Sequence, residues 1–366
     1  MESNKSNPLR MKILYITVRS DFGGGPRHVG QLIDNMPNDM DIYMAYPKGG
    51  DPYGKIWDNC SSIKGVCHIP YRKFSIKSLF ELRKIVITNK IDIVHSHGNG
   101  GGLYSRMLKL LGCKIKVVHT FHGITDNYTN RLKGLANKIS GKILKHLTDS
   151  FILVSKGELD IGIRLNVLAR ERSYVIYNGI AIPPAHDDRE CKNTFDIVSL
   201  SRFDYQKNMD LSLEIARIFK ENKDIRFVWV GNGTDYERLK AKSEKERLNI
   251  VFTGFSKEPY KYLESSDIYL SSSRFEGLPY ALIEAASVGL PIIATDVVGN
   301  NEVVVNGKTG YLYTTVEDAV SKITYLFDNP SIRQCMSKES ENFFRQNFTI
   351  GKMIDSLVTV YKELFK

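Results

Sequence analysis

Short apolar runs rich in Val and Ile alternate with segments of helical periodicity along almost the whole of this 366-residue chain. The runs have the length of strands and show little polar alternation, which is typical of strands buried on both faces of a parallel sheet. Their alternation with helices predicts a doubly wound α/β fold. The expected strands are residues 12–18, 40–46, 91–95, 116–120, 150–154, 174–177, 195–200, 225–230, 250–253, 268–270, 291–294 and 311–313.

The chain is long enough for two domains of ordinary size. Residues 178–193 contain a Pro pair, small residues and charges between two expected strands, which favours a domain boundary there. We therefore expect an N-terminal domain over residues 11–180 and a C-terminal domain over residues 194–345. Residues 350–366 place apolar side chains at helical spacing and predict a last helix that packs across the domain junction.

Composition excludes several classes of protein. Hydrophobic residues make up 42% and charged residues 25%, as in ordinary soluble proteins. We find no apolar run of transmembrane length and no secretion signal in the first ten residues, which we expect to be disordered. The five cysteines are scattered and form no C-x-x-C motif, so neither a disulfide framework nor a structural zinc site is indicated. A cytoplasmic location is expected.

Positive charge is concentrated in the first half. Residues 1–180 contain 27 Lys and Arg against 14 Asp and Glu, whereas the rest of the chain contains 24 against 27. Such a distribution favours an anionic partner for the first half. Nucleic acid is disfavoured, because no zinc finger, RNP1 sequence or KH-type loop accompanies the charge.

Residues 130–150 form the strongest candidate for membrane contact. Their apolar residues share one helical face, basic residues cover much of the remainder, and no acidic residue occurs between Asp126 and Asp149. A helix of this type can lie on anionic lipid. A core-facing helix with a basic solvent face is the commoner case. The basic first half leads us to expect peripheral attachment to the inner face of the cell membrane.

The stretch from Ser271 to Val304 contains two carboxylates around an expected helix start. Glu276 precedes this helix, Glu284 lies within it, and Pro279 is expected at its first position. Free N–H groups and the positive dipole end of a helix favour phosphate, and nearby carboxylates can bind sugar hydroxyls. This stretch therefore predicts a sugar-nucleotide site.

Two cations follow the first strand of the second half. Arg202 and Lys207 both lie where that strand leads into a helix, and together they can bind a diphosphate and stabilise its charge as it leaves. A solvated loop is the alternative, but two cations at this topological position favour the functional interpretation. The turn at Gly231-Asn232-Gly233 follows the next strand and could shape a base or ribose pocket.

Gly23-Gly24-Gly25-Pro26 follows the first strand and opens an expected helix over residues 26–36. Glycines permit close approach of a phosphate, and Pro26 fits the first helical position. A tight strand-to-helix turn explains the motif equally well. The motif is not G-x-G-x-x-G, and no acidic residue ends the second strand, which argues against NAD.

Four histidines lie at the ends of two expected strands. His95 and His97 could suggest zinc, but no carboxylate or cysteine lies nearby to complete a ligand set, and no metal site is predicted. We interpret His95 and His119 as core or loop histidines. His122 lies beyond its strand and is expected to face a cleft.

Taken in order, these motifs resemble the family 4 retaining glycosyltransferases of the GT-B class, which serve bacterial surface-polysaccharide assembly. The resemblance covers nearly the whole chain from Met11. It rests most specifically on Glu276 and Glu284 with seven residues between them. The remaining matches are the Gly-rich first turn, HTFHG, YNGI, SLSRFDYQKN, VWVGNGTDYERL, VFTGF and FEGLPYALIEAASVGLPIIATDVVGNNEVV. Asn300-Asn301 departs from the family pattern and leaves the turn before Glu302 uncertain.

The resemblance implies two Rossmann-like domains that face a cleft, with the last helix crossing back to the first domain. The donor would bind mainly to the second domain and the acceptor to the first. Arg202 and Lys207 would hold the donor diphosphate, Glu284 the ribose hydroxyls, and Glu276 the transferred sugar, with His122 nearby. The further donor contacts implied are the backbone groups of Gly24, Gly25, Gly277, Leu278, Pro279 and Tyr280.

The implied reaction is retaining transfer of a hexose or N-acetylhexosamine. Its donor would be a UDP-sugar, which the motifs hardly distinguish from a GDP-sugar. Its acceptor would be a polyprenyl-diphosphate-linked glycan in O-antigen or capsule synthesis. No metal or other cofactor is expected. A UDP-sugar epimerase of the same fold and a non-catalytic sugar-nucleotide-binding protein are the alternatives.

Overall fold

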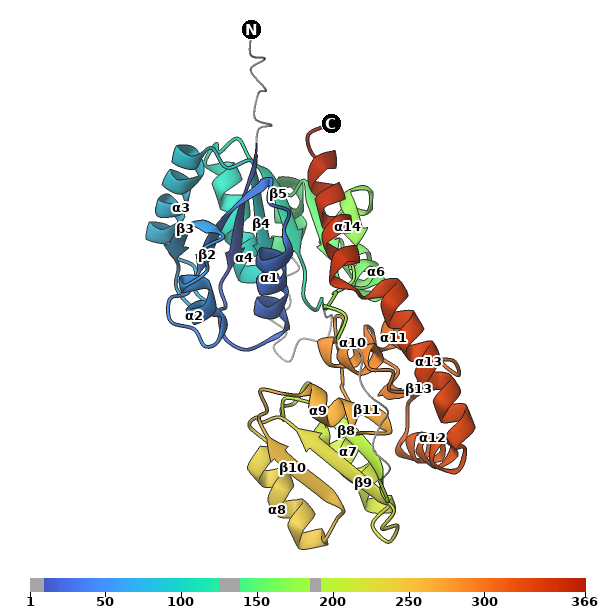
Figure 1. The fold of residues 1–366 in the computed structure, drawn as a ribbon. Coiled ribbons are helices and arrows are strands. Elements are labelled where there is room, and N and C mark those ends of the chain that lie inside the picture. Colours follow the sequence, from blue (N-terminus) through green and yellow to red (C-terminus); the bar gives the residue numbers. More distant parts are fainter. Residues whose placement is uncertain (1–9, 125–138, 185–191) are drawn as a thin grey trace. The chain divides into compact units, whose positions relative to one another are not determined.

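The chain forms two compact units, as seen in a computed structural model that describes residues 10–124, 139–184 and 192–366. The N-terminal unit comprises Met1–Ile176 with Met353–Lys366, and the C-terminal unit comprises Tyr177–Lys352. Each unit contains one parallel sheet flanked by helices (Figure 1). The predicted doubly wound α/β class is confirmed.

The sheet of the N-terminal unit has seven strands in the order β3-β2-β1-β4-β5-β6-β7. Its strands are β1 Met11–Thr17, β2 Met40–Tyr46, β3 Ile63–His68, β4 Ile93–His97, β5 Lys116–Thr120, β6 Ser150–Leu153 and β7 Ser173–Val175. The helices described here are α1 Gly24–Asn35, α2 Tyr53–Asp58, α3 Ile76–Asn89, α4 Gly98–Leu110, α6 Lys156–Arg164 and the short 3₁₀ turns Lys145–Leu147 and Arg170–Arg172.

The sheet of the C-terminal unit has six strands in the order β10-β9-β8-β11-β12-β13. They are β8 Phe195–Leu200, β9 Ile225–Val230, β10 Ile250–Gly254, β11 Ile268–Ser271, β12 Ile292–Thr295 and β13 Gly310–Tyr313. The helices are α7 Met209–Ile218, α8 Tyr236–Glu246, α9 Tyr260–Glu264, α10 Tyr280–Ser287, α11 Asn300–Val303, α12 Val316–Asp328 and α13 Pro330–Asn347.

Both sheets reverse their strand order at the first strand of the unit. In the N-terminal unit β1 lies between β2 and β4, and in the C-terminal unit β8 lies between β9 and β11. Ligands of open α/β sheets bind beyond the carboxyl ends of the strands at such a switch point. We therefore expect ligand-binding residues in the loops after β1 and β4 and in the loops after β8 and β11.

The observed strands match the predicted ones within a few residues, except for β3, which the sequence analysis missed. Ile63–His68 is an edge strand whose side chains are mostly exposed or half-buried. Its central Gly65 leaves room for the ring of Tyr43 on β2. A strand exposed in this way does not give the continuous apolar run on which the prediction relied.

Two predicted helix starts are wrong by one or two residues. Helix α1 begins at Gly24, so Pro26 is its third residue rather than its first. Helix α10 begins at Tyr280, and Pro279 is its N-cap in an extended conformation. All these positions lack an intrahelical partner for the backbone N–H, which is why proline is tolerated at each of them.

The last helix, α14 (Ile350–Glu363), packs mainly in the N-terminal unit. The apolar positions read from the sequence include its buried residues Met353, Ile354, Leu357, Val360 and Tyr361. The Tyr361 hydroxyl lies 2.5 Å from His95 Nδ1 and 3.2 Å from the Tyr15 hydroxyl. The predicted return of the chain end to the first unit is confirmed.

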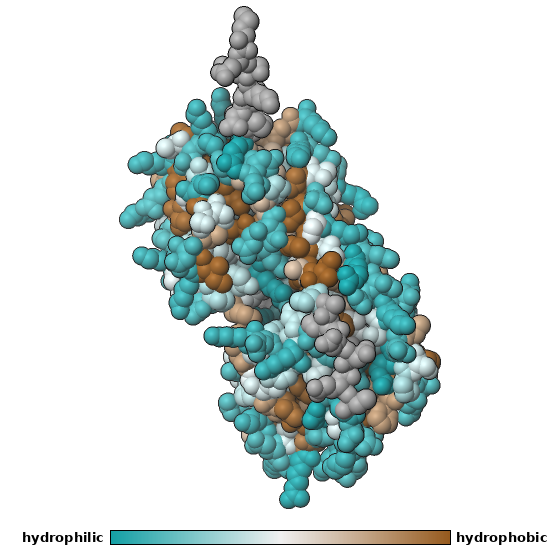
Figure 2. All heavy atoms as spheres, viewed as in Figure 1, coloured by the Kyte–Doolittle hydropathy of each residue, from teal (hydrophilic) through white to brown (hydrophobic). Residues whose placement is uncertain are grey.

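No helix among the described residues is both long enough and apolar enough to span a bilayer. Hydrophilic residues cover most of the face that Figure 2 shows, with hydrophobic residues in scattered groups. Residues 130–138 of the basic segment lie outside the described residues. Within its described part, the apolar side chains of Ile139 and Ile143 are exposed, so they do not face a core as the commoner interpretation would require.

Candidate functional site

A buried ion pair lies at the switch point of the C-terminal sheet. Lys207 follows β8 and Glu276 follows β11, and Lys207 Nζ lies 2.6 Å from Glu276 Oε1. The two side chains are only 18% and 7% exposed. An ion pair with so little solvent around it is strongly sensitive to the loss of either partner. The structure thus brings together two of the predicted site residues, 69 positions apart in the chain.

Further hydrogen bonds connect the two loops that carry this pair. Gln206 Nε2 donates to Glu276 Oε2 at 3.2 Å and to the carbonyl oxygen of Phe275 at 3.1 Å. The Ser272 hydroxyl donates to the carbonyl oxygen of Lys207 at 2.9 Å. Glu276 is therefore held through both carboxylate oxygens.

Arg202 lies on the same loop after β8 but is more exposed. Its side chain is 44% exposed, and Nη2 lies 3.1 Å from Asp204 Oδ2 and 3.2 Å from Gln206 Oε1. Because these contacts are at the surface, they leave the guanidinium able to move toward an arriving anion at little cost. The loop thus presents one largely buried cation paired with Glu276 and one exposed cation paired with Asp204.

The segment from Gly277 to Tyr280 leads from Glu276 into helix α10. Asn178 Nδ2 donates to the carbonyl oxygen of Leu278 at 2.8 Å, and Pro279 adopts φ −75° and ψ 122° as the N-cap. Glu284 lies within α10 and is 6% exposed. The structure therefore confirms that Glu276 precedes the helix and that Glu284 is inside it. Their roles in donor binding stay predictions.

The turn that departs from the family pattern is well supported. Asn300 is fully buried, and its Nδ2 donates to the carbonyl oxygen and to Oγ1 of Thr295, both at 3.1 Å. These bonds tie the start of α11 to the end of β12. Gly299 has φ +87°, and a Cβ atom there would lie 2.4 Å from the Gly277 carbonyl oxygen. This turn therefore packs closely against the start of the segment 277–280, which leads into α10.

We expect Gly299→Ala to disturb residues 277–280 as well as the turn. The left-handed φ costs about 1–3 kcal/mol for a residue with a side chain, and the Gly277 carbonyl must also shift. Gly307→Ala is the matched control, because Gly307 has φ +77° with open space around it. The midpoint temperature of thermal unfolding should fall further, and the KM for the sugar donor should rise further, in Gly299→Ala than in Gly307→Ala. Equal effects would show that the contact with Gly277 is unimportant.

In the N-terminal unit, His122 lies against the Gly-rich turn. A Cβ atom on Gly25 would lie 3.6 Å from His122 Cδ2, so these predicted site residues are neighbours. His97, at the end of β4, places Nδ1 3.2 Å from His122 Nε2. His28, on α1, makes ring contacts with both. The sequence analysis missed His28, although its place one turn after Gly24 in the helix that opens the site could have indicated it.

His95 and His119 are buried, as predicted for core histidines. His95 Nε2 lies 2.7 Å from Thr120 Oγ1, and its Nδ1 contacts Tyr361. His119 Nδ1 lies 3.0 Å from Ser96 Oγ. Burial lowers the pKa of both imidazoles well below the usual value. Both are neutral histidines that make side-chain hydrogen bonds in the core. The contact of His95 with Tyr361 connects the sheet to α14.

The carboxylate of Glu158 supports the loop that follows β5 and carries His122. Glu158 lies in the first turn of α6 and is fully buried. Its Oε1 accepts hydrogen bonds from the backbone N–H groups of Gly123 and, at 2.8 Å, Ile124, and its Oε2 accepts one from Val154 at 3.1 Å. One side chain therefore satisfies donors at the ends of two neighbouring strands.

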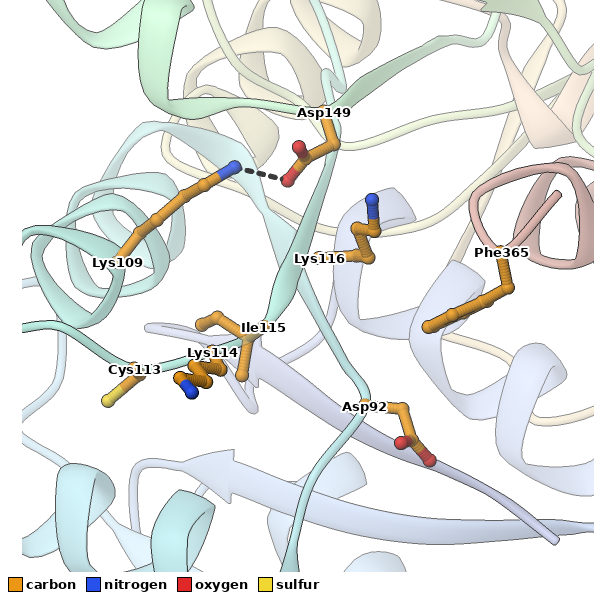
Figure 3. Close-up of a pocket in the computed structure, with 8 residues that line it drawn as sticks. All are labelled: Asp92, Lys109, Cys113, Lys114, Ile115, Lys116, Asp149 and Phe365. Atoms are coloured by element: carbon orange, nitrogen blue, oxygen red, sulfur yellow. Dashed lines mark hydrogen bonds and ion pairs between the residues drawn. The ribbon is translucent and has the colours of Figure 1, made fainter. Parts of the chain in front are cut away.

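A cavity of about 430 Å³ lies at the opposite edge of the same sheet. Asp92 precedes β4, Lys116 begins β5 and Asp149 precedes β6, so the cavity borders the amino ends of these strands. Figure 3 shows Lys109 pointing to Asp149, with Nζ 2.5 Å from Oδ2. This edge is not where ligands of such sheets bind, and we do not place the functional site there.

Sequence comparison matches both halves of the chain to families of known activity. The profile of the family described as "Glycosyltransferase Family 4" matches residues 22–182, and that of "Glycosyl transferases group 1" matches residues 186–343. The chain is 26% identical to the UDP-Gal:alpha-D-GlcNAc-diphosphoundecaprenol alpha-1,3-galactosyltransferase of Escherichia coli, over 98% of this chain and 99% of that protein. It is also 26% identical to the E. coli O-antigen biosynthesis glycosyltransferase WbnH, over 91% and 96% of the two chains.

Structure comparison gives the same fold. The crystal structure of Anabaena HepE in complex with UDP and glucose matches with a TM-score of 0.80 at 14% identity, over 96% of this chain and all of that one. A glycosyltransferase from Rickettsia africae matches with a TM-score of 0.82 at 19% identity, over 98% and 99% of the two chains.

Proposed function

The chain belongs to glycosyltransferase family 4, and from this premise we propose that it transfers a hexose or N-acetylhexosamine from a UDP-sugar to a hydroxyl of a polyprenyl-diphosphate-linked glycan. The observation that carries the proposal is the buried Lys207–Glu276 pair, with Arg202 on the same loop, at the switch point of the C-terminal sheet. Two cations suit a diphosphate, and a carboxylate held by its neighbours suits sugar hydroxyls.

Relatives support the choice of donor and acceptor. The E. coli galactosyltransferase is named for UDP-galactose and for a GlcNAc linked to diphosphoundecaprenol. WbnH is named for O-antigen biosynthesis, and HepE was crystallised with UDP and glucose. We therefore assign this chain to bacterial surface-polysaccharide synthesis, with a UDP-linked donor.

The proposed mechanism retains the configuration at the sugar C1 atom and uses no metal. The bond from C1 to the diphosphate oxygen breaks, and the acceptor oxygen bonds to C1 from the same face. The acceptor proton passes to the leaving diphosphate oxygen. Arg202 and Lys207 stabilise the charge on the diphosphate, Glu276 orients the sugar, Glu284 binds the ribose and His122 lies near the sugar. Electrostatic stabilisation of this kind is commonly the largest contribution to catalysis.

A donor screen by nucleotide release tests this function. UDP- and GDP-sugars are each incubated with a panel of lipid-diphosphate sugar acceptors in the presence of EDTA. We expect UDP release that depends on the acceptor, with a product whose new linkage keeps the donor configuration. Release or rearrangement without acceptor would instead indicate an epimerase. Donor binding without turnover over the whole panel would indicate a non-catalytic protein, and rescue by manganese would contradict the metal-free mechanism.

We also propose that the N-terminal unit attaches peripherally to the inner face of the cell membrane. The basic first half provides the attraction to anionic lipid, and Ile139 and Ile143 are 51% and 64% exposed beside the exposed Lys142. This arrangement suits a lipid-linked acceptor, which presents its sugar at the membrane surface.

Sedimentation with liposomes tests the attachment. At low salt the full chain should sediment with anionic vesicles and not with neutral phosphatidylcholine vesicles, and added salt should release it because salt screens surface charge. Ile143→Ser should weaken sedimentation. Ile218→Ser is the matched control, since Ile218 is an exposed isoleucine of the C-terminal unit. Equal recovery with both lipids, or none with either, would contradict the electrostatic attachment.

A further inference from the structure

Three imidazoles from separate elements converge at the switch point of the N-terminal sheet. His28 comes from α1, His97 ends β4 and His122 follows β5. One ring nitrogen from each lies within 4.8 Å of the other two. The rings of His97 and His122 are stacked, with an angle of 18° between their planes. The histidine cluster, meaning His28, His97 and His122, therefore brings three nitrogen donors to one point.

The surroundings keep these nitrogens suited to bind a cation. His28 and His97 are 2% and 3% exposed, and His122 is half-buried. Arg19 is the nearby cation, and Asp21 neutralises it through bonds of 2.8 and 2.9 Å.

Hydrogen bonds do not pair all the ring nitrogens of the histidine cluster. His97 Nδ1 and His122 Nε2 can share one proton at 3.2 Å. The other nitrogen of His97, Nε2, is buried and meets no partner among the described residues. Buried polar nitrogens are normally paired, but His119 Nε2 outside the cluster is unpaired as well, so the spacing of the facing nitrogens, rather than His97 Nε2, supports a bound ion.

The spacing of the nitrogens fits a tetrahedral ion. Zn–N bonds of about 2.0–2.1 Å at a tetrahedral angle place two ligand nitrogens about 3.3 Å apart. The observed separation of His97 Nδ1 and His122 Nε2 is 3.2 Å. The His28 nitrogen lies within 4.8 Å of both and must approach them to reach the same spacing.

We propose that His28, His97 and His122 form a binding site for a divalent transition-metal ion of the zinc class. Three imidazoles without a carboxylate suit zinc, nickel or copper, whereas magnesium and manganese prefer oxygen ligands. Three protein ligands leave the fourth position of a tetrahedral ion open to water. The site shares His122 with the position proposed near the transferred sugar, but it supplies no step of the transfer and makes no use of the donor residues of the C-terminal unit.

Metal binding by the full chain, with any affinity tag removed, tests the site. We expect one Zn²⁺ per chain by equilibrium dialysis in excess Mg²⁺, and bound Co²⁺ should give the intense visible absorption of a four-coordinate ion. His28→Gln and His97→Gln should each weaken affinity at least about tenfold, since even the loss of a supporting partner costs about 10–100-fold. His146→Gln is the matched control, because His146 is exposed and outside the cluster.

Three outcomes would overturn the proposal. They are no binding of Zn²⁺ by the wild-type chain, a weak Co²⁺ spectrum typical of six-coordination, and equal affinity in the cluster variants and the control. Cys60→Ser and Cys335→Ser, which replace the two free cysteines of the described chain that are not buried, should leave binding unchanged. Loss of binding in these variants would be a fourth contrary result, because it would assign the ion to thiolates. The Co²⁺ spectrum of the wild-type chain keeps the test decisive even if a histidine variant does not fold.

Discussion

Lys207→Ala is expected to lower turnover by about a hundred- to a thousand-fold, the usual effect of removing one charge-stabilising contact. The Lys207 ammonium lies 2.6 Å from Glu276 Oε1, with both side chains largely buried. Its loss therefore removes a cation proposed for the diphosphate and also leaves a buried carboxylate without its counter-ion. Initial rates with a confirmed UDP-sugar and acceptor measure the effect.

A control and a double mutant separate these two contributions. Lys308 pairs with Glu339 at 3.0 Å ahead of β13, at the amino edge of the C-terminal sheet, and Lys308→Ala should keep native turnover. Lys207→Ala combined with Glu276→Ala should cost much less than the two single losses added together, because paired groups act as a unit. Near-native turnover of Lys207→Ala would refute the role proposed for this pair.

Local sequence patterns predicted most of the fold because the chain repeats one simple unit. Buried parallel strands are continuous apolar runs, and they were found to within a few residues. The exception, β3, is an edge strand with half-exposed side chains. Helix starts at Pro26 and Pro279 were misplaced, since proline is tolerated at several positions in the first turn of a helix.

Site residues could be predicted from the sequence where they lie on one loop. Contacts between residues of loops that are distant in the sequence could not be predicted in this way. Arg202 and Lys207 follow one strand, so the strand end alone indicated a phosphate site. The 2.6 Å contact of Lys207 with Glu276 depends on β8 lying beside β11, which is a property of the sheet order. His28 was missed for the same reason. It completes a cluster with His97, which ends β4, and His122, which follows β5, so only its place one turn after Gly24 could have indicated it.

Glu158→Ala is expected to destabilise the N-terminal unit by at least about 3 kcal/mol, because three backbone N–H groups lose their acceptor and each unsatisfied donor costs about 1–3 kcal/mol. These donors belong to Gly123, Ile124 and Val154, and the carboxylate that they share is fully buried. Glu158→Gln should cost less, since its amide oxygen can still accept from Gly123 and Ile124 while its amide nitrogen faces Val154 N–H. A larger loss of stability in Glu158→Ala than in Glu158→Gln would be expected if the loss of the hydrogen-bond acceptor causes the destabilisation.

Unfolding of the N-terminal unit in urea can be followed separately by tryptophan fluorescence. The chain has two tryptophans, Trp57 in the N-terminal unit and Trp229 in the C-terminal unit. In a Trp229→Phe background, the fluorescence of the buried Trp57 should follow unfolding of the N-terminal unit in urea. Glu171→Ala is the control, because the Glu171 side chain is 74% exposed and its loss should leave the midpoint unchanged. If Glu158→Ala unfolds at the same urea concentration as this control, the carboxylate does not hold the loop that carries His122.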